Sequence, residues 1–115
     1  MKIIIGITGA SGIIYATTLI DRLREEIYLI ITENAKRIMM FETKMDYKTL
    51  EKKVNKIYND SDLFASVASG STKFDAFVVI PASMNTIAKF ANGIADTLIT
   101  RVFSVSLKIK NSKPI

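Results

Sequence analysis

The 115-residue sequence contains neither cysteine nor histidine, and these two absences exclude several kinds of chemistry. Without cysteine there is no disulfide framework, no thiol nucleophile and no thiolate metal site. Without histidine the chain lacks the commonest zinc ligand and the commonest general base at neutral pH. We therefore expect no metal, and any catalysis must use carboxylates, lysine, arginine, hydroxyls, the backbone or a cofactor.

Long apolar runs and clusters of basic residues are also missing. The N-terminal apolar run stops at Gly6, and no later run approaches the roughly 18 residues needed to span a bilayer. The net charge of +5 is spread along the chain, whereas nucleic-acid binding favours clustered basic residues interleaved with aromatics. We expect a soluble, cytoplasmic protein that binds neither membrane nor nucleic acid, although a face for polyanions is the alternative.

The composition, 49% apolar and 23% charged, is that of a globular protein, and the length suits a single domain over residues 1–115. Hydrophobic patterns predict buried strands at residues 2–7, 27–32 and 75–83. They predict helices at residues 13–24, 33–41, 44–58, 84–93 and 95–110. Strands that alternate with helices predict an α/β fold with a parallel sheet between two helical layers.

The remaining segments are less regular. Residues 62–71 are expected to be extended and to end in a Ser/Gly loop, and residues 111–115 to turn into a further strand. A helix that crosses over a parallel sheet needs a following strand to return to. We therefore expect a C-terminally incomplete chain, the front part of a longer fold.

The stretch GITGASG, residues 6–12, follows the first strand and opens the first helix. Glycines let the backbone approach a ligand, and the amides at a helix start attract an anion. This pattern favours a phosphate site. The alternative is that the glycines only allow close packing of strand and helix.

A second stretch, PASMNT at residues 81–86, follows the third predicted strand. In open parallel sheets ligands bind outside the carboxyl ends of the strands, where both loops fall. We predict that the two loops act together on one ligand. The alternative for Ser83 alone is a helix N-cap.

Four other residues are candidates, each with a plainer alternative. Thr32 ends the second strand and could reach a ligand, or be β-branched filler. Arg101, in an apolar helical stretch, could bind a phosphate, pair with an acid or extend to solvent. Lys108 lies two turns along the same helix and could be solvated, and Glu42 could carry a proton or be a surface acid.

Several stretches together resemble the UbiX flavin prenyltransferases, within the flavin-binding homo-oligomeric Cys decarboxylase superfamily. They are GITGASG, ETK at 42–44, ASGS at 68–71, VSLK at 105–108 and DAFVVIPASMNTIAKFANGIADTLITR at 75–101. The resemblance implies a Rossmann-like fold with flavodoxin-like layering that binds FMN. It implies transfer of a dimethylallyl group from dimethylallyl phosphate to reduced FMN without a metal. The prenylated FMN would pass to UbiD-type decarboxylases, and the protein would be a homo-oligomer, commonly dodecameric in this family.

The resemblance also implies roles for particular residues. The cofactor-binding residues would be Gly9, Ala10, Ser11, Thr32, Ser83, Met84, Asn85, Thr86 and Arg101. The catalytic residues would be Glu42 for proton transfer, Ser11, and Lys108 near the prenyl phosphate. Ser69 and Gly70 would border the prenyl pocket. Such a site needs no protein nucleophile, because the electron-rich reduced flavin is itself the nucleophile.

Two alternative functions remain open at this point. One is a flavin-dependent cysteine decarboxylase, which the missing histidine disfavours. The other is a non-catalytic FMN-binding or assembly subunit, which a C-terminally incomplete chain favours.

Overall fold

Strand β1 (Lys2–Ile7) is central in the structure, a computed structural model that describes residues 1–69 and 73–111. Its isoleucines are buried on both faces, as a β-branched run without polar alternation predicts. β1 pairs in parallel with β2 (Glu26–Ile31) on one side and β4 (Ala76–Val79) on the other. With β3 (Lys56–Asn59), the described residues form a four-stranded parallel sheet in the order β3-β2-β1-β4.

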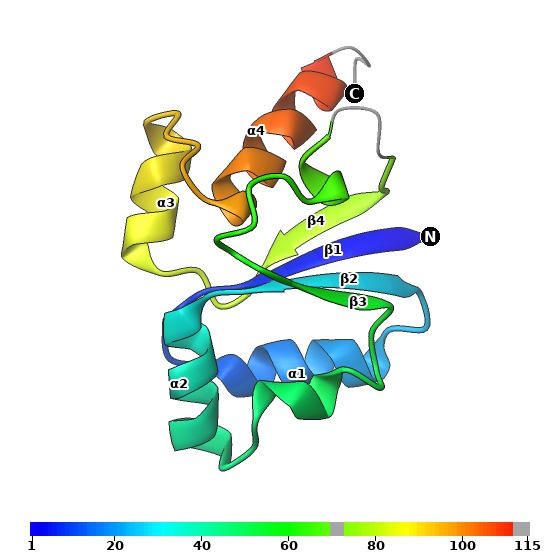
Figure 1. The fold of residues 1–115 in the computed structure, drawn as a ribbon, viewed down its shortest axis with the longest axis vertical. Coiled ribbons are helices and arrows are strands. Elements are labelled where there is room, and N and C mark those ends of the chain that lie inside the picture. The colour runs from blue at the N-terminus through cyan, green and yellow to red at the C-terminus, as the bar shows by residue number, and fades with distance from the viewer. Residues whose placement is uncertain (70–72, 112–115) are drawn as a thin grey trace.

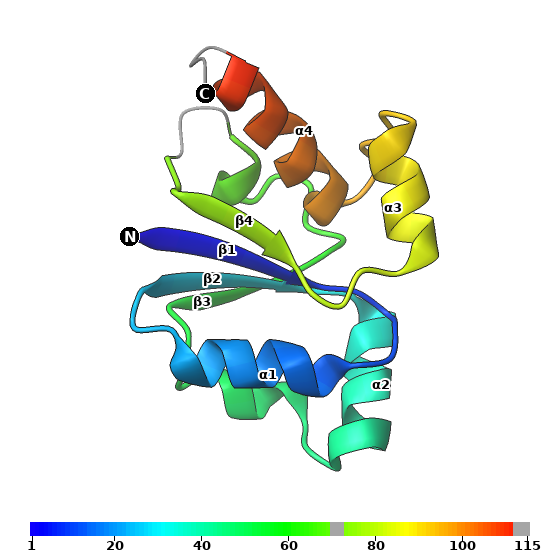
Figure 2. The same ribbon diagram turned by 180° about the vertical axis from the view of Figure 1, so that it is seen from behind.

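Helices cover both faces of this sheet. Helices α1 (Ile13–Arg22) and α2 (Glu33–Thr43) lie on one face, and α3 (Met84–Ala91) and α4 (Leu98–Asn111) lie on the other (Figures 1 and 2). The fold is therefore a three-layer α/β/α arrangement around a parallel sheet. The predicted Rossmann-like fold with flavodoxin-like layering is confirmed.

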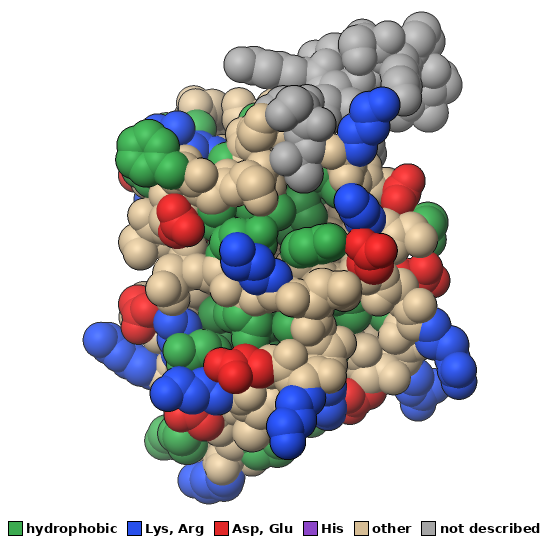
Figure 3. Space-filling model, turned by 45° about the vertical axis from the view of Figure 1, so that its right-hand side comes forward, with side chains coloured by type: hydrophobic (Ala, Val, Ile, Leu, Met, Phe, Trp, Pro, Cys, Tyr) green, Lys and Arg blue, Asp and Glu red, His purple; other side chains and the backbone are tan. Residues whose placement is uncertain are grey.

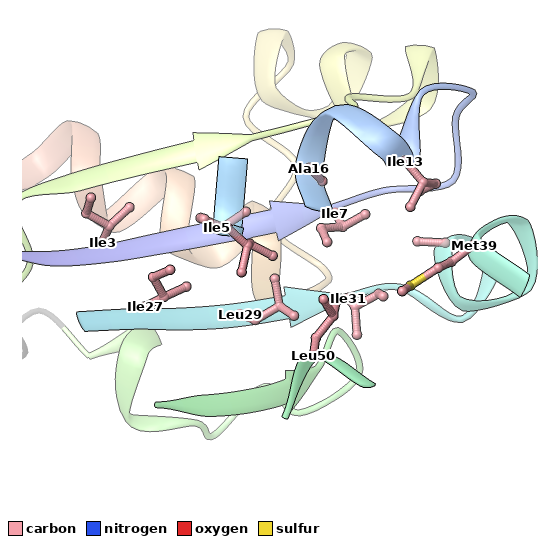
Figure 4. Packing of buried hydrophobic residues seen from close by; sticks show 12 residues of the cluster. Ile3, Ile5, Ile7, Ile13, Ala16, Ile27, Leu29, Ile31, Met39 and Leu50 are labelled. Atoms are coloured by element: carbon pink, nitrogen blue, oxygen red, sulfur yellow. The ribbon is translucent and has the colours of Figure 1, made fainter. Parts of the chain in front are cut away.

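The core consists of two clusters, one on each face of the sheet. Alternate residues of β1, including Ile5 and Ile7, pack with Ile13 of α1 and Met39 of α2 (Figure 4). Ile4 points the other way, into a cluster that contains residues of α4. Because the side chains of a strand alternate between its faces, one short strand holds both helical layers in place.

The order in which the chain adds parallel strands to the sheet reverses at β1. From β1 the chain moves outward to β2 and β3, and it then returns to place β4 on the opposite side of β1. In open α/β sheets ligands bind at the carboxyl ends of the strands where the order reverses in this way. The loops after β1 and β4 lie at that position.

The predicted helix over residues 44–58 is wrong. The segment contains a short 3-10 helix, η1 (Tyr47–Leu50), and strand β3. Asn55 directs the chain onto the sheet, because its side-chain Oδ1 accepts from Ile27 N–H and its own N–H donates to Ile27 O. Leu50 is buried and Ile57 is partly buried, so apolar residues of this segment still pack on the core.

Other boundaries also differ from the predictions. Helix α1 ends at Arg22 rather than at residue 24, because Leu23 is extended. The extended segment predicted at residues 62–71 contains a 3-10 helix, η2 (Ser66–Ala68). Gly70, and the strand predicted to follow residue 111, lie outside the described residues.

The surface carries mixed charge. On the face shown in Figure 3, Lys and Arg side chains lie interspersed with Asp and Glu. Within residues 1–69 and 73–111, no helix has both the length and the apolar character needed to cross a bilayer.

Candidate functional site

The loops after β1 and β4 meet at Thr8. The Thr8 hydroxyl donates to Pro81 O at 2.7 Å, and Ser83 N–H donates to the Thr8 Oγ1 at 2.7 Å. The predicted proximity of GITGASG and PASMNT is therefore confirmed. A single side chain spans the two loops.

A cleft of about 320 Å³ lies where these loops meet. Five predicted site residues line it, namely Gly9, Thr32, Ser83, Asn85 and Thr86. Seven further residues complete the lining, namely Thr8, Asn34, Asp60, Lys89, Thr97, Ile99 and Thr100. The volume lies within the range of small-molecule sites, and the many hydroxyl and amide groups suit a polar, hydrogen-bonding ligand.

The cleft is suited to an anionic group because α2 and α3 begin at it. Thr32 caps α2 by accepting from Ala35 N–H at 3.0 Å, and Ser83 caps α3 by accepting from Thr86 N–H at 3.2 Å. The first amides of each helix have no partner within the helix, and they point toward the positive end of its dipole. These amides provide donors for a phosphate or for the polar edge of a ring.

Gly9 allows the first loop to lie against the start of α2. A Cβ atom built on Gly9 would lie 2.7 Å from the Cβ of Asn34, a distance that real side chains essentially never show. The absence of a side chain at this position therefore lets the two backbones approach. The glycine thus serves a close approach of the first loop to α2, at a position that lines the cleft.

Glu42 belongs to the last turn of α2, and its carboxylate lies at the start of α1 rather than in the cleft lining. Its Oε1 accepts from Gly12 N–H at 3.3 Å and from Ile13 N–H at 3.2 Å. The anion held by the first amides of α1 in this structure is therefore the carboxylate of Glu42. A ligand phosphate at GITGASG must use the amides before Gly12, or replace this carboxylate.

Replacing Glu42 with alanine should lower the free energy of unfolding by about 1 kcal/mol, the usual cost of losing an N-terminal cap. The Glu42→Gln variant keeps an acceptor oxygen but loses the charge that favours the helix dipole, so its loss should be smaller. Urea unfolding of the three proteins measures both differences. Equal stability of E42A and wild type would contradict the capping role.

The start of α4 is held by two threonines that bond to each other and by the acidic residue that follows β3. Thr97 N–H donates to the Thr100 hydroxyl at 2.9 Å, and Thr100 N–H donates to the Thr97 hydroxyl at 3.2 Å. Asp60, directly after β3, accepts from Ile99 N–H through Oδ1 at 2.8 Å. Asp60 thus connects the edge of the sheet to α4 while it lines the cleft.

Burial raises the pKa of the Asp60 carboxyl above its ordinary value. The hydrogen bonds that Asp60 accepts and the nearby Lys89 oppose this rise in pKa without cancelling it. The carboxyl of the folded protein therefore binds its proton more tightly than that of the unfolded chain. The contribution of Asp60 to the free energy of unfolding is fully present below the pKa that its carboxyl has in the unfolded chain. This contribution is lost as pH rises through the pKa that the carboxyl has in the folded protein.

The Asp60→Asn variant should remove that dependence on pH. The stability advantage of wild type over D60N should be largest below the ordinary pKa of aspartate, and it should shrink as pH rises to a plateau above the folded pKa. Urea unfolding of both proteins, in steps from pH 3 to pH 7, measures the difference between their free energies of unfolding. Because the other carboxylates are present in both proteins, their effects cancel in this difference. A difference that grows with rising pH would contradict the raised pKa.

The structure does not bring every predicted residue to the cleft. Ala10 and Ser11 continue the first loop, and the side chain of Met84 is 80% exposed, but none of the three is part of the lining. Arg101 lies on α4 with an exposed side chain, outside the lining. Lys108 also belongs to α4, but its side chain lies outside the described residues.

Asp60 and Lys89 are the charged residues of the lining that the sequence analysis missed. Asp60 would have been found if β3 had been recognised, because it is the residue after that strand. Lys89 sits in a helix pattern that gives no sign of a cleft. In the structure its Nζ bonds both carboxylate oxygens of Asp96, at 3.0 and 3.2 Å, which holds the lysine beside the cleft.

Comparison with known proteins places this geometry in context. The family described as Flavoprotein matches residues 1–115. A curated flavin prenyltransferase UbiX from Methanocaldococcus jannaschii is 47% identical over 110 residues, covering 94% of this chain and 60% of the relative. A UbiX from Thermoplasma acidophilum is 44% identical over 109 residues, covering 94% of this chain and 61% of the relative.

Solved structures show the same similarity. AnUbiX in complex with FMN and dimethylallyl pyrophosphate gives a TM-score of 0.88 at 31% identity, covering 93% of this chain and 58% of that chain. A dodecameric FMN-dependent UbiX-like decarboxylase from Escherichia coli O157:H7 gives a TM-score of 0.87 at 33% identity, covering 94% of this chain and 61% of that chain. The chain thus spans about three fifths of the length of these relatives.

Proposed function

The chain belongs to the Flavoprotein family, and on that premise we propose that it is the FMN-binding domain of a flavin prenyltransferase. The proposed reaction transfers a dimethylallyl group from dimethylallyl phosphate to reduced FMN. The observation that carries the proposal is the cleft at which the loops after β1 and β4 are joined through Thr8. The relatives named as flavin prenyltransferases, at 47% and 44% identity, support it.

The residues of the cleft fit FMN on physical grounds. The ligand carries a phosphate, a hydroxyl-rich ribityl chain and a polar-edged ring. The starts of α2 and α3 offer amide donors for anionic and polar atoms, and Thr32, Ser83 and Thr86 offer hydroxyls beside them. Gly9 lines the cleft without a side chain of its own, so its backbone can approach a flat or charged group.

The chain's own residues have distinct tasks in this proposal. Gly9, Ala10 and Ser11 hold the cofactor from the first loop, and Ser83 through Thr86 hold it from the second. When bound, reduced FMN supplies the nucleophile, so no protein nucleophile is needed. Positive side chains stabilise the negative charge that develops on the departing phosphate.

Three positive residues are proposed to act at the site, and they do not share one task. Lys108 is proposed near the prenyl phosphate and Arg101 on the flavin, as the resemblance implies. Lys89, which lines the cleft, is the cation nearest the two loops among the described lining residues. Glu42 is proposed to move a proton after it releases the amides of Gly12 and Ile13, to which it is bonded in this structure.

The proposed assembly is a homo-oligomer. Several large apolar side chains are exposed, among them Tyr15 at 68%, Phe41 at 80% and Met84 at 80%. Copies of the chain that pack together would bury such side chains, and the similar protein from Escherichia coli is described as dodecameric. The product would pass to a UbiD-type decarboxylase.

An anaerobic incubation tests the reaction. The purified protein is mixed with reduced FMN and dimethylallyl phosphate, and the mass of the extracted flavin is measured. A flavin with an added five-carbon unit supports the transferase. Unmodified FMN that stays on the protein instead favours the second candidate, a flavin-binding subunit without transfer. A protein that retains no flavin contradicts both.

A further inference from the structure

We infer that Thr8 is a positioning residue that sets the spacing of the two loops, an inference that rests on the proposed FMN site for its functional meaning. Thr8 is 1% exposed and follows the last residue of β1. A buried hydroxyl needs hydrogen-bond partners. Both partners of the Thr8 hydroxyl lie in the loop after β4, at Pro81 and Ser83.

The Thr8 hydroxyl adds a side-chain contact where the backbone pairing of β1 with β4 ends. The backbone pairing of β1 with β4 continues as far as Ile80 N–H, which donates to Gly6 O at 2.9 Å. Two residues further along the first chain segment, Thr8 N–H donates to Pro81 O at 3.2 Å, and the Thr8 hydroxyl accepts from Ser83 N–H. The hydroxyl therefore extends the strand pairing beyond the proline.

The contact places the start of α3. Ser83 donates its backbone N–H to Thr8 and uses its own hydroxyl to accept from Thr86 N–H. Thr8 thus holds the residue that caps α3, and with it the first amides of that helix. On the other side, Thr8 is covalently joined to Gly9, which is packed against Asn34. One hydroxyl therefore determines how far the amides of α3 lie from the first loop.

A simpler alternative is that Thr8 is filler, a β-branched side chain that only occupies space at the end of a strand and whose hydroxyl has no role in spacing the loops. The Thr8→Val variant separates the two roles, because valine keeps the shape and removes the hydroxyl. If the hydroxyl sets the spacing, T8V should bind FMN about tenfold more weakly, the loss expected when a buried amide loses its acceptor. The absorption spectrum of the bound flavin should also shift, because the ring would meet displaced donors. If Thr8 is filler, affinity and spectrum should match those of wild type.

The pair Thr8→Ser and Thr8→Ala provides a second comparison in case valine disturbs folding. Both variants lose the same methyl group, and they differ only in the hydroxyl. T8S should restore FMN affinity and the flavin spectrum relative to T8A. Thr17→Val, which removes a hydroxyl that donates to Ile14 O within α1, is the matched control and should leave both unchanged. Equal affinity and equal spectra for T8S and T8A would overturn the inference.

Hydrogen exchange keeps this test independent of the flavin. The Ser83 amide should exchange about tenfold faster in T8V than in wild type, because its acceptor is lost. The Ile20 amide of α1 should be unaffected. If wild type binds no FMN, the proposed function fails, yet faster exchange at Ser83 would still support the spacing role of Thr8. Unchanged exchange at Ser83 in T8V would overturn that role whether or not FMN binds.

Discussion

Replacing Gly9 with alanine is expected to reduce FMN affinity about a hundredfold, the loss expected when hydrogen-bond donors to a bound ligand are displaced. The added Cβ would lie 2.7 Å from the Cβ of Asn34. Because that atom is fixed to the backbone of α2, it has no rotamer that avoids the clash. The first loop or the start of α2 must therefore move. The strain should also lower the free energy of unfolding by about 2 kcal/mol.

A second substitution tests the assigned cause. Asn34→Gly removes the clashing atom, and the next nearest atoms to the new Cβ would then be backbone atoms at 3.6 and 3.7 Å, ordinary contact distances. Adding G9A should therefore cost much less stability in the N34G background than in wild type. Urea unfolding of the four proteins of this double-mutant cycle measures the coupling. Additive losses would show that Asn34 is not the reason for glycine at position 9.

The second large effect is expected from replacing Ile99 with alanine. Ile99 is 1% exposed, and its side chain lies over Gly6, where a built Cβ would be only 3.3 Å away. The side chain thus fills the space between α4 and β1, and it also lines the cleft. Its truncation should lower the free energy of unfolding by about 3 kcal/mol, the usual cost of a cavity in a core.

The same chemical change on the surface is the control. Ile14→Ala removes the same atoms from a side chain that is 55% exposed, so it should cost little stability. Thermal unfolding of the two variants and wild type separates burial from helix propensity, because both positions are helical. A small loss in I99A would mean that α4 does not pack on the sheet as described.

Much of this arrangement could be predicted from local patterns. The isoleucine run of β1 has a single interpretation, because it is too short for a helix and has no polar face. The loop after it and the loop at Pro81 were placed at the same edge by the rule for parallel strands, and Thr8 confirms their contact. The cap formed by Ser83 was predicted as an alternative to ligand binding, and the structure shows that the cap forms.

Other parts depend on contacts that no local pattern contains. Residues 44–58 carry apolar residues at helical spacing, yet Asn55 pairs with Ile27 and places β3 beside β2. The position of Asp60 in the cleft follows from that strand and was missed with it. Glu42 was proposed as a proton carrier from the sequence and again from the resemblance, but its bonds are to amides about thirty residues earlier in the chain. That catalytic assignment stays a prediction.

The most direct test of the central idea is a crystal structure of the protein soaked with FMN. We predict flavin density in the cleft between Gly9 and Ser83, with the phosphate within hydrogen-bonding distance of the amides at a loop or helix start. Density at another surface, or none in crystals that hold FMN at saturating concentration, would contradict the assignment of this cleft as the flavin site.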